Sequence, residues 1–202
     1  MQIVCLDLEG VLVPEIWIEF AKRTGIAELS KTTRDEPDYD KLMRSRIGTL
    51  ERHHLGLPDI QKVIAQMSPL EGAREFLDWL RESWQVVILS DTYYEFSRPL
   101  MCQLGHPTLF CNELVADESG RVRDYSLRLP DQKRVSVRAF RALGFHTIAV
   151  GDSYNDTSML AEAHTGILFR PPHNVAAEFP QHAVTRDYEE LRREILTATR
   201  TP

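Results

Sequence analysis

The chain has 202 residues, of which 43% are hydrophobic and 27% charged, and a net charge of −6. This composition predicts one globular domain, with or without an insertion, and excludes a disordered, collagen-like or coiled-coil chain. The acidic excess argues against a nucleic-acid or membrane partner, because both need a basic face. Three cysteines without a CxxC pair, no apolar run of about 20 residues and no targeting segment lead us to expect a cytoplasmic protein.

Four short apolar runs predict buried parallel strands. They cover residues 3–6, 86–89, 148–150 and 166–169. Segments with helical periodicity alternate with these runs and continue beyond them. They cover residues 71–81, 93–104, 131–143, 154–163 and 188–197. Such an alternation predicts an α/β fold, with a doubly wound, mostly parallel sheet and helices on both of its faces.

The stretch between the first two strands is too long for a single crossover helix. It contains three helical segments, at residues 16–23, 39–53 and 58–65. We therefore predict a small helical cap, residues 14–69, inserted after the first strand of a core formed by residues 1–13 and 70–202. A second interruption, residues 113–128, has the pattern of a basic β-hairpin.

Acidic residues follow the predicted strands at the positions where the strands end. Asp7 follows the first strand, with Glu9 two residues later, and Asp152 and Asp156 follow the third. Because ligands of open α/β sheets bind at the carboxyl ends of the strands, these four carboxylates are expected to converge. Two negative charges ~4 Å apart repel by about 4 kcal/mol at an effective dielectric constant near 20. The cluster therefore predicts a bound cation, and oxygen ligands favour Mg²⁺.

Four motifs in chain order resemble those of the haloacid-dehalogenase superfamily of phosphohydrolases. They are DLEGV at residues 7–11, SDT at 90–92, Lys133 and GDSYND at 151–156. The opening motif and the stretch ILSDTYYEFS also resemble a subgroup of phosphoserine phosphatases that are in addition homoserine phosphotransferases. This resemblance implies a Rossmann-like core. Glu9 stands where most members of the superfamily have Asp, and the subgroup shares that departure.

The resemblance implies a role for each matching residue. Asp7 is the expected nucleophile, Glu9 the general acid and base, and Lys133 the cation that contacts both Asp7 and the phosphate. Mg²⁺ is expected on Asp7, the backbone carbonyl of Glu9 and Asp152. Asp156 is expected to orient the waters of the metal ion. The remaining expected ligands of the phosphate are Ser90, Asp91, Gly10 and Asn155.

Two residues of the predicted cap match substrate ligands of phosphoserine phosphatases. Glu15 is expected to bind the substrate ammonium group and Arg46 the carboxylate. Arg44 is a rival for the second role, and a solvated helix face would explain either arginine without a ligand. The expected activity is Mg²⁺-dependent hydrolysis of O-phospho-L-serine, with transfer to L-homoserine as a second activity. The alternatives are a phosphatase of another small phosphometabolite and a phospho-accepting signalling domain.

Overall fold

The computed structural model describes residues 1–33, 35–36 and 38–200. Its described part forms a sheet of seven strands in the order β4-β3-β2-β1-β5-β6-β7. The strands are β1 (Gln2–Leu6), β2 (Gln85–Tyr93), β3 (Leu109–Ala116), β4 (Val122–Ser126), β5 (His146–Gly151), β6 (Thr165–Phe169) and β7 (Ala183–Thr185). All neighbouring strands are parallel except β3 and β4. The predicted α/β class with a mostly parallel sheet is therefore confirmed.

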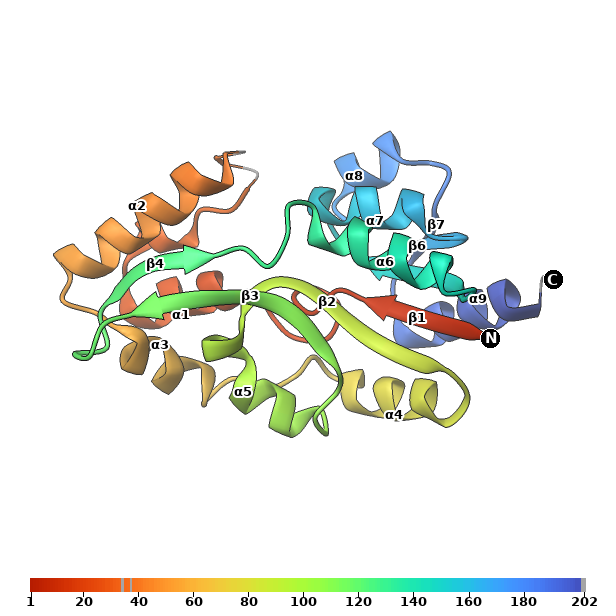
Figure 1. Ribbon diagram of the computed structural model, residues 1–202, viewed down its shortest axis with the longest axis horizontal. Helices are drawn as coiled ribbons and strands as arrows, with labels where there is room; N and C mark the ends of the chain where they lie inside the picture. The colour runs from red at the N-terminus through yellow and green to blue at the C-terminus, as the bar shows by residue number, and fades with distance from the viewer. Residues whose placement is uncertain (34, 37, 201–202) are drawn as a thin grey trace.

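Helices cover both faces of this sheet (Figure 1). They are α4 (Ala73–Ser83), α5 (Tyr94–Gln103), α6 (Gln132–Ala142), η2 (Tyr154–Asp156), α7 (Thr157–Glu162), α8 (His173–Glu178) and α9 (Tyr188–Arg200). Successive residues of a strand point to opposite faces, so that β1 contributes to two cores. Val4 and Leu6 pack in the core with α4 and α9, whereas Ile3 and Cys5 pack in the core with α6 and α7. Both faces are thus buried, as apolar runs without alternation predict.

The described residues between β1 and α4 form four helical elements beside the sheet, at the left of Figure 1. They are α1 (Ile16–Thr24), η1 (Ala27–Ser30), α2 (Tyr39–Arg52) and α3 (Leu57–Ile64). These elements share a continuous apolar core with α5. Within it, the Trp17 and Phe96 rings meet edge to face with their centroids 5.5 Å apart. The inserted helices are therefore packed against the sheet domain through apolar side chains.

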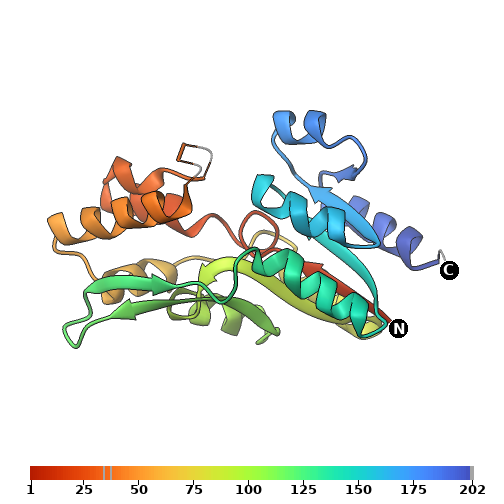
Figure 2. The ribbon, with the colours of Figure 1, turned by 45° about the horizontal axis from the view of Figure 1, so that its top comes forward.

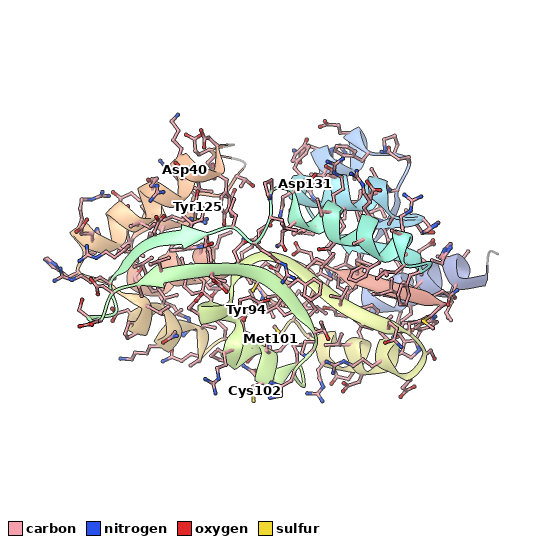
Figure 3. All side chains as sticks on the ribbon, viewed as in Figure 1. Asp40, Tyr94, Met101, Cys102, Tyr125 and Asp131 are labelled. Carbon is pink, nitrogen blue, oxygen red and sulfur yellow. The ribbon has the colours of Figure 1, made fainter. Side chains whose placement is uncertain are left out.

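The hairpin formed by β3 and β4 extends alongside α2, and Figure 2 shows the hairpin and this helix on the same side of the molecule. The Tyr125 hydroxyl donates a hydrogen bond to Asp40 over 2.7 Å (both residues are labelled in Figure 3). Arg44 lies 2.9 Å from Asp124, and the Leu57 amide donates to the Gly120 carbonyl. The sequence predicts this hairpin but not its packing against the inserted helices.

Two local features differ from the predicted elements. Strand β2 continues to Tyr93, whereas the apolar run ends at residue 89 and a helix was expected from residue 93. The polar residues Ser90 and Asp91 interrupt the run but lie in extended backbone. The short elements α8 and β7 carry too few residues for a periodic signal.

No helix in the described ranges is long and apolar enough to cross a membrane.

Candidate active site

The predicted acidic residues lie together at the carboxyl ends of β1, β2 and β5. Leu6, the last residue of β1, is paired with Ile88 in β2 and with Val150 in β5, so the residues that follow these pairs lie at nearly the same level of the sheet, although β2 continues to Tyr93. Asp7 and Asp152 follow directly, and Ser90 lies near the end of β2. These three residues line a cavity of about 480 Å³. The topology therefore brings together residues that are up to 145 positions apart.

Lys133 is the buried cation of this site. It lies on the first turn of α6 and is only 2% exposed. Its ammonium nitrogen is 3.0 Å from Asp7 Oδ1, 2.8 Å from Asp156 Oδ1 and 3.6 Å from Asp91 Oδ2. These carboxylates raise the pKa of Lys133 despite its burial, which acts in the opposite direction. The ammonium group is therefore held in place beside Asp7, as the motif order predicts.

Asp156 is fully buried, and hydrogen bonds occupy both of its carboxylate oxygens. Oδ1 contacts Lys133, while Oδ2 accepts hydrogen bonds from the amides of Asp152 (2.9 Å) and Ser153 (3.1 Å). The sequence-based interpretation gave Asp156 the task of orienting water on a metal ion. The contacts in the structure show that it holds Lys133 and the turn that follows β5, and its contact with metal-bound water stays a prediction.

Three buried carboxylates form a group that could hold a metal ion. Oxygen atoms of Asp7, Asp152 and Asp156 all lie within 4.8 Å of one another. Burial and the charge of Asp156 raise the pKa of Asp7 well above its usual range. Burial, Asp156 and Glu15 raise the pKa of Asp152 to about 7. Because the oxygens of Asp156 are occupied, Asp7 and Asp152 are the two carboxylates that fit a cation.

Gly10 allows the loop after β1 to approach this cluster closely. Its φ of 77° lies in the left-handed region, and a Cβ at this position would lie 2.4 Å from Asp152 Cγ. A side chain here would therefore be strained and would also displace Asp152. The Gly10 amide donates a hydrogen bond to the Val13 carbonyl over 2.8 Å. This amide is consequently engaged within the loop, which differs from the predicted contact with phosphate.

Glu9 lines the cavity with Asp7, and its carboxyl group is held by the inserted helices. Its Oε2 accepts a hydrogen bond of 2.9 Å from the amide of Ile16, the first residue of α1. Burial and the nearby Glu15 raise the pKa of Glu9 to about 8. A carboxyl group with such a pKa exchanges a proton near neutral pH, as general acid–base chemistry requires.

Ser90, Asp91 and Asn155 also line the cavity. The Asn155 amide donates to Asp91 Oδ2 over 3.2 Å, and Ser90 Oγ accepts a hydrogen bond from the Thr92 amide. Gln132, which the sequence analysis did not single out, donates to the Ser90 carbonyl and is almost fully buried. Its position next to Lys133 at the start of α6 is the one signal that could have indicated it.

The structure distinguishes between the two candidate arginines of α2. Arg46 lines the cavity with Glu15, is 7% exposed, and lies over the Trp17 ring with 4.5 Å from its guanidinium carbon to the ring centroid. It also donates to the Lys31 carbonyl over 2.7 Å. Arg44 instead lies on the outer side of the helix, where it pairs with the hairpin residue Asp124.

Tyr39 is a cavity residue that the sequence analysis missed. Its hydroxyl group lies 2.7 Å from that of Tyr93 and 3.3 Å from the backbone carbonyl of Asp91. It therefore joins α2 to the end of β2 beside the site. Tyrosines are common in the cores of such chains, and nothing in the sequence marks this one.

The fold and site are those of a phosphohydrolase, and comparison with known proteins assigns the family. The profile of the haloacid dehalogenase-like hydrolases matches residues 1–164, and the chain belongs to this family. It is 63% identical to the phosphoserine phosphatase ThrH of Pseudomonas aeruginosa, over 98% of this chain and 97% of that protein. It is 60% identical to a phosphoserine phosphatase of Pseudomonas syringae, over 98% of this chain and 84% of that protein.

Solved structures agree on the fold. The crystal structure of a phosphoserine phosphatase from T. onnurineus aligns with a TM-score of 0.73 and 25% identity, covering 94% of this chain and 92% of that one. A substrate-bound phosphoserine phosphatase aligns with a TM-score of 0.78 over 96% and 97% of the chains, and its 22% identity supports the fold alone. Membership of a hydrolase family favours the enzyme hypothesis over the signalling domain.

Proposed function

We propose that the chain hydrolyses O-phospho-L-serine to L-serine and phosphate through an aspartyl-phosphate on Asp7. The observation that carries this proposal is the composition of a single cavity. The sheet domain contributes Asp7 and Lys133, and the inserted helices contribute Glu15 and Arg46. Phosphoserine has a phosphate, an ammonium and a carboxylate group, and this cavity offers a partner for each. The two relatives at 63% and 60% identity support the same substrate.

In this proposal residues 14–69 form a cap that selects the substrate, over a catalytic core of residues 1–13 and 70–202. The inserted helices supply Glu15 and Arg46, while the strand ends of the core supply Asp7, Ser90 and Asp152. Selection and chemistry are thereby separated into two parts of the chain.

The reaction proceeds in two displacements. A carboxylate oxygen of Asp7 attacks phosphorus, the bond from phosphorus to the serine oxygen breaks, and that oxygen takes its electron pair together with a proton from Glu9. A water oxygen then attacks phosphorus and gives a proton to Glu9, and the bond to Asp7 breaks to restore the carboxylate. Lys133 balances negative charge beside Asp7, while Ser90, the backbone amide of Asp91 and Asn155 bind the phosphate oxygens.

We further propose that the metal ion is Mg²⁺, bound by the carboxylates of Asp7 and Asp152 and the carbonyl of Glu9. Oxygen ligands and a phosphate substrate favour this ion. When bound, it supplies positive charge that lowers the repulsion between the Asp7 carboxylate and the phosphate.

Metal removal has an expected signature in the pH dependence of stability. Folding raises the pKa of Asp152 from 3.8 to about 7 and that of Glu9 from 4.5 to about 8. The folded state then binds more protons than the unfolded state between about pH 4 and pH 8, so the metal-free protein loses stability as the pH rises through this window.

Mg²⁺ is expected to reverse the part of this loss that arises from Asp152, because the ion binds the ionised carboxylate. Thermal unfolding in EDTA and in excess Mg²⁺, measured from pH 5 to pH 8, tests this expectation. The difference between the two midpoints should widen with pH. A difference that is constant or narrows with pH would contradict the assigned metal ligands.

The Arg46→Ala substitution is expected to impair turnover of phosphoserine but not of a simple aryl phosphate. Loss of a buried charge-assisted hydrogen bond to the substrate costs about 2–3 kcal/mol, or a ~30–150-fold decrease in kcat/KM. Arg44→Ala is the matched control from the same helix, since Arg44 pairs with Asp124 outside the cavity. Equal losses in both variants, or equal losses with both substrates, would refute the role of Arg46.

Transfer of the phosphoryl group to L-homoserine is a second candidate activity. Homoserine carries the same ammonium and carboxylate groups as serine and a hydroxyl group on a chain one methylene longer. It therefore suits Glu15 and Arg46, and its hydroxyl group would take the place of water in the second displacement.

The test is release of phosphate from O-phospho-L-serine with Mg²⁺, with and without L-homoserine, and with analysis of the products. Phosphate without homoserine establishes the phosphatase. A decrease in phosphate with formation of O-phosphohomoserine establishes the transferase. Cleavage of an aryl phosphate alone would retain the chemistry, refute the substrate and favour another small phosphometabolite.

A further inference from the structure

We infer that the backbone amide of Ile16 positions the carboxyl group of Glu9, so that the first turn of the cap helix α1 controls the acid–base group of the reaction. The inference rests on the role proposed for Glu9. The amide donates to Glu9 Oε2 over 2.9 Å. Glu9 itself belongs to the loop that follows β1, so this hydrogen bond joins the catalytic loop to the cap.

The Ile16 amide is available because it lies at a helix N-terminus. The first four amides of an α-helix have no acceptor within the helix. Glu15 precedes the helix but makes no capping hydrogen bond through its side chain. Glu9, seven residues earlier in the chain, provides the acceptor instead. A carboxylate in this position is also favoured by the dipole of the helix.

The backbone that follows Glu9 is held by contacts within its own loop and with α9. The Gly10 amide donates to the Val13 carbonyl, and the Tyr188 hydroxyl donates to the Val11 carbonyl over 2.6 Å. The backbone near Glu9 is thus fixed by the core, whereas its carboxyl group is fixed by the cap. A side chain one methylene shorter would not span the same distance, which gives the glutamate at this position a structural reason.

The same helical turn also carries substrate contacts. Glu15 lines the cavity directly before Ile16, and the Trp17 ring directly after it lies under the Arg46 guanidinium group. Three consecutive residues therefore serve the site. Glu15 is the proposed ligand of the ammonium group, the Ile16 amide holds the Glu9 carboxyl group, and the Trp17 ring supports Arg46. A displacement of this turn moves the binding groups and the acid–base group together, which couples recognition of the substrate to catalysis.

Ile16→Pro replaces the amide hydrogen with the Cδ of proline, so the hydrogen bond to Glu9 is lost and its carboxyl group is displaced. Proline is favoured at the first position of a helix, and Glu15, with φ −58° and ψ 113°, already has the conformation that a residue before proline adopts. Ile16→Val is the matched control, because it keeps the amide and likewise has one side-chain carbon fewer than isoleucine. We expect kcat for phosphoserine to fall about 10–100-fold in Ile16→Pro and to stay within about twofold in Ile16→Val.

An aryl phosphate separates misplacement of Glu9 from general damage. Its leaving group needs no proton, so the first displacement should stay fast, while the second still needs Glu9 as a base. Ile16→Pro should therefore release a burst of about one molecule of phenol product per active site, followed by slow turnover. Loss of the burst itself, or equal kcat in the Pro and Val variants, would overturn the inference. This readout holds even if phosphoserine is not the substrate.

A double-mutant cycle provides the second criterion. An aspartate at position 9 is too short to reach the Ile16 amide, so adding Ile16→Pro to Glu9→Asp should lower kcat by less than about twofold further. An equal loss in both backgrounds would refute the coupling.

If Ile16→Pro does not fold, amide hydrogen exchange decides. The Ile16 amide should exchange at least ~10-fold faster in Glu9→Asp than in the wild type, with a smaller change at Trp17. Unchanged exchange at Ile16 would refute the hydrogen bond.

Discussion

Replacement of Asp7 by asparagine is expected to lower turnover by about 10⁴-fold or more and to abolish the phosphoenzyme. An amide oxygen is a poor nucleophile, so no phosphoenzyme should form at this position. Acid-quenched protein after reaction with ³²P-labelled substrate should carry label in the wild type and none in Asp7→Asn.

The same substitution should leave the fold intact. Three carboxylates crowd around one ammonium group, and removal of one of them relieves repulsion while Lys133 keeps its contact with Asp156. In the absence of metal, the unfolding midpoint of Asp7→Asn should equal or exceed that of the wild type. Asp187→Asn is the control, since asparagine caps a helix as well as aspartate does and Asp187 caps α9 without lining the cavity. Residual label in Asp7→Asn would assign the nucleophile to another residue.

Lys133→Met is expected to damage both stability and activity. The substitution removes an ammonium group that makes ion pairs with Asp7, Asp91 and Asp156 at 3.0, 3.6 and 2.8 Å. Breaking a buried ion pair from one side costs about 3–5 kcal/mol, because the opposite charges stay buried without compensation. Loss of a cation aimed at the developing charge lowers kcat by about 10²–10³-fold. Denaturant unfolding and steady-state kinetics measure the two effects.

Arg134→Met is the matched control for this substitution. Arg134 is the next residue of α6, but it is partly exposed and pairs with Asp131 at the surface. Its loss should change the free energy of unfolding by less than about 1 kcal/mol. Because Mg²⁺ also compensates the carboxylates, it should restore part of the stability lost in Lys133→Met. If Lys133→Met were stable and active, the buried carboxylates around Lys133 would not need its ammonium group for charge compensation.

Several features of the site could be predicted because parallel strands have level carboxyl ends. Asp7, Ser90 and Asp152 each follow or end an apolar run, and the topology of an open sheet places such residues at one edge. The residues alone do not show that Lys133 belongs to the site, since a lysine on a helix is usually solvated. Its burial between Asp7 and Asp156 depends on where α6 begins relative to the sheet.

Other features depend on contacts between segments that are distant in sequence. The sequence does not distinguish Arg44 from Arg46 as a ligand of the substrate. Only the packing of α2 against α1 and the hairpin directs Arg46 into the cavity. Tyr39 and Gln132 reach the site through backbone carbonyls of β2, which no side-chain pattern reports. The hydrogen bond from Ile16 to Glu9 likewise requires the cap helix to begin at one particular place above the loop.

The sequence by itself determined the α/β class, the inserted helices and the acidic residues next to the strand ends. Those properties follow from local periodicity and from residues next to strand ends, which are encoded within a few positions. Only the tertiary structure decided which charges are buried, which arginine lines the cavity and which backbone amide holds Glu9. Burial and hydrogen-bond partners are set by the packing of separate segments. A buried charge is stabilised by groups that lie far from it in the sequence.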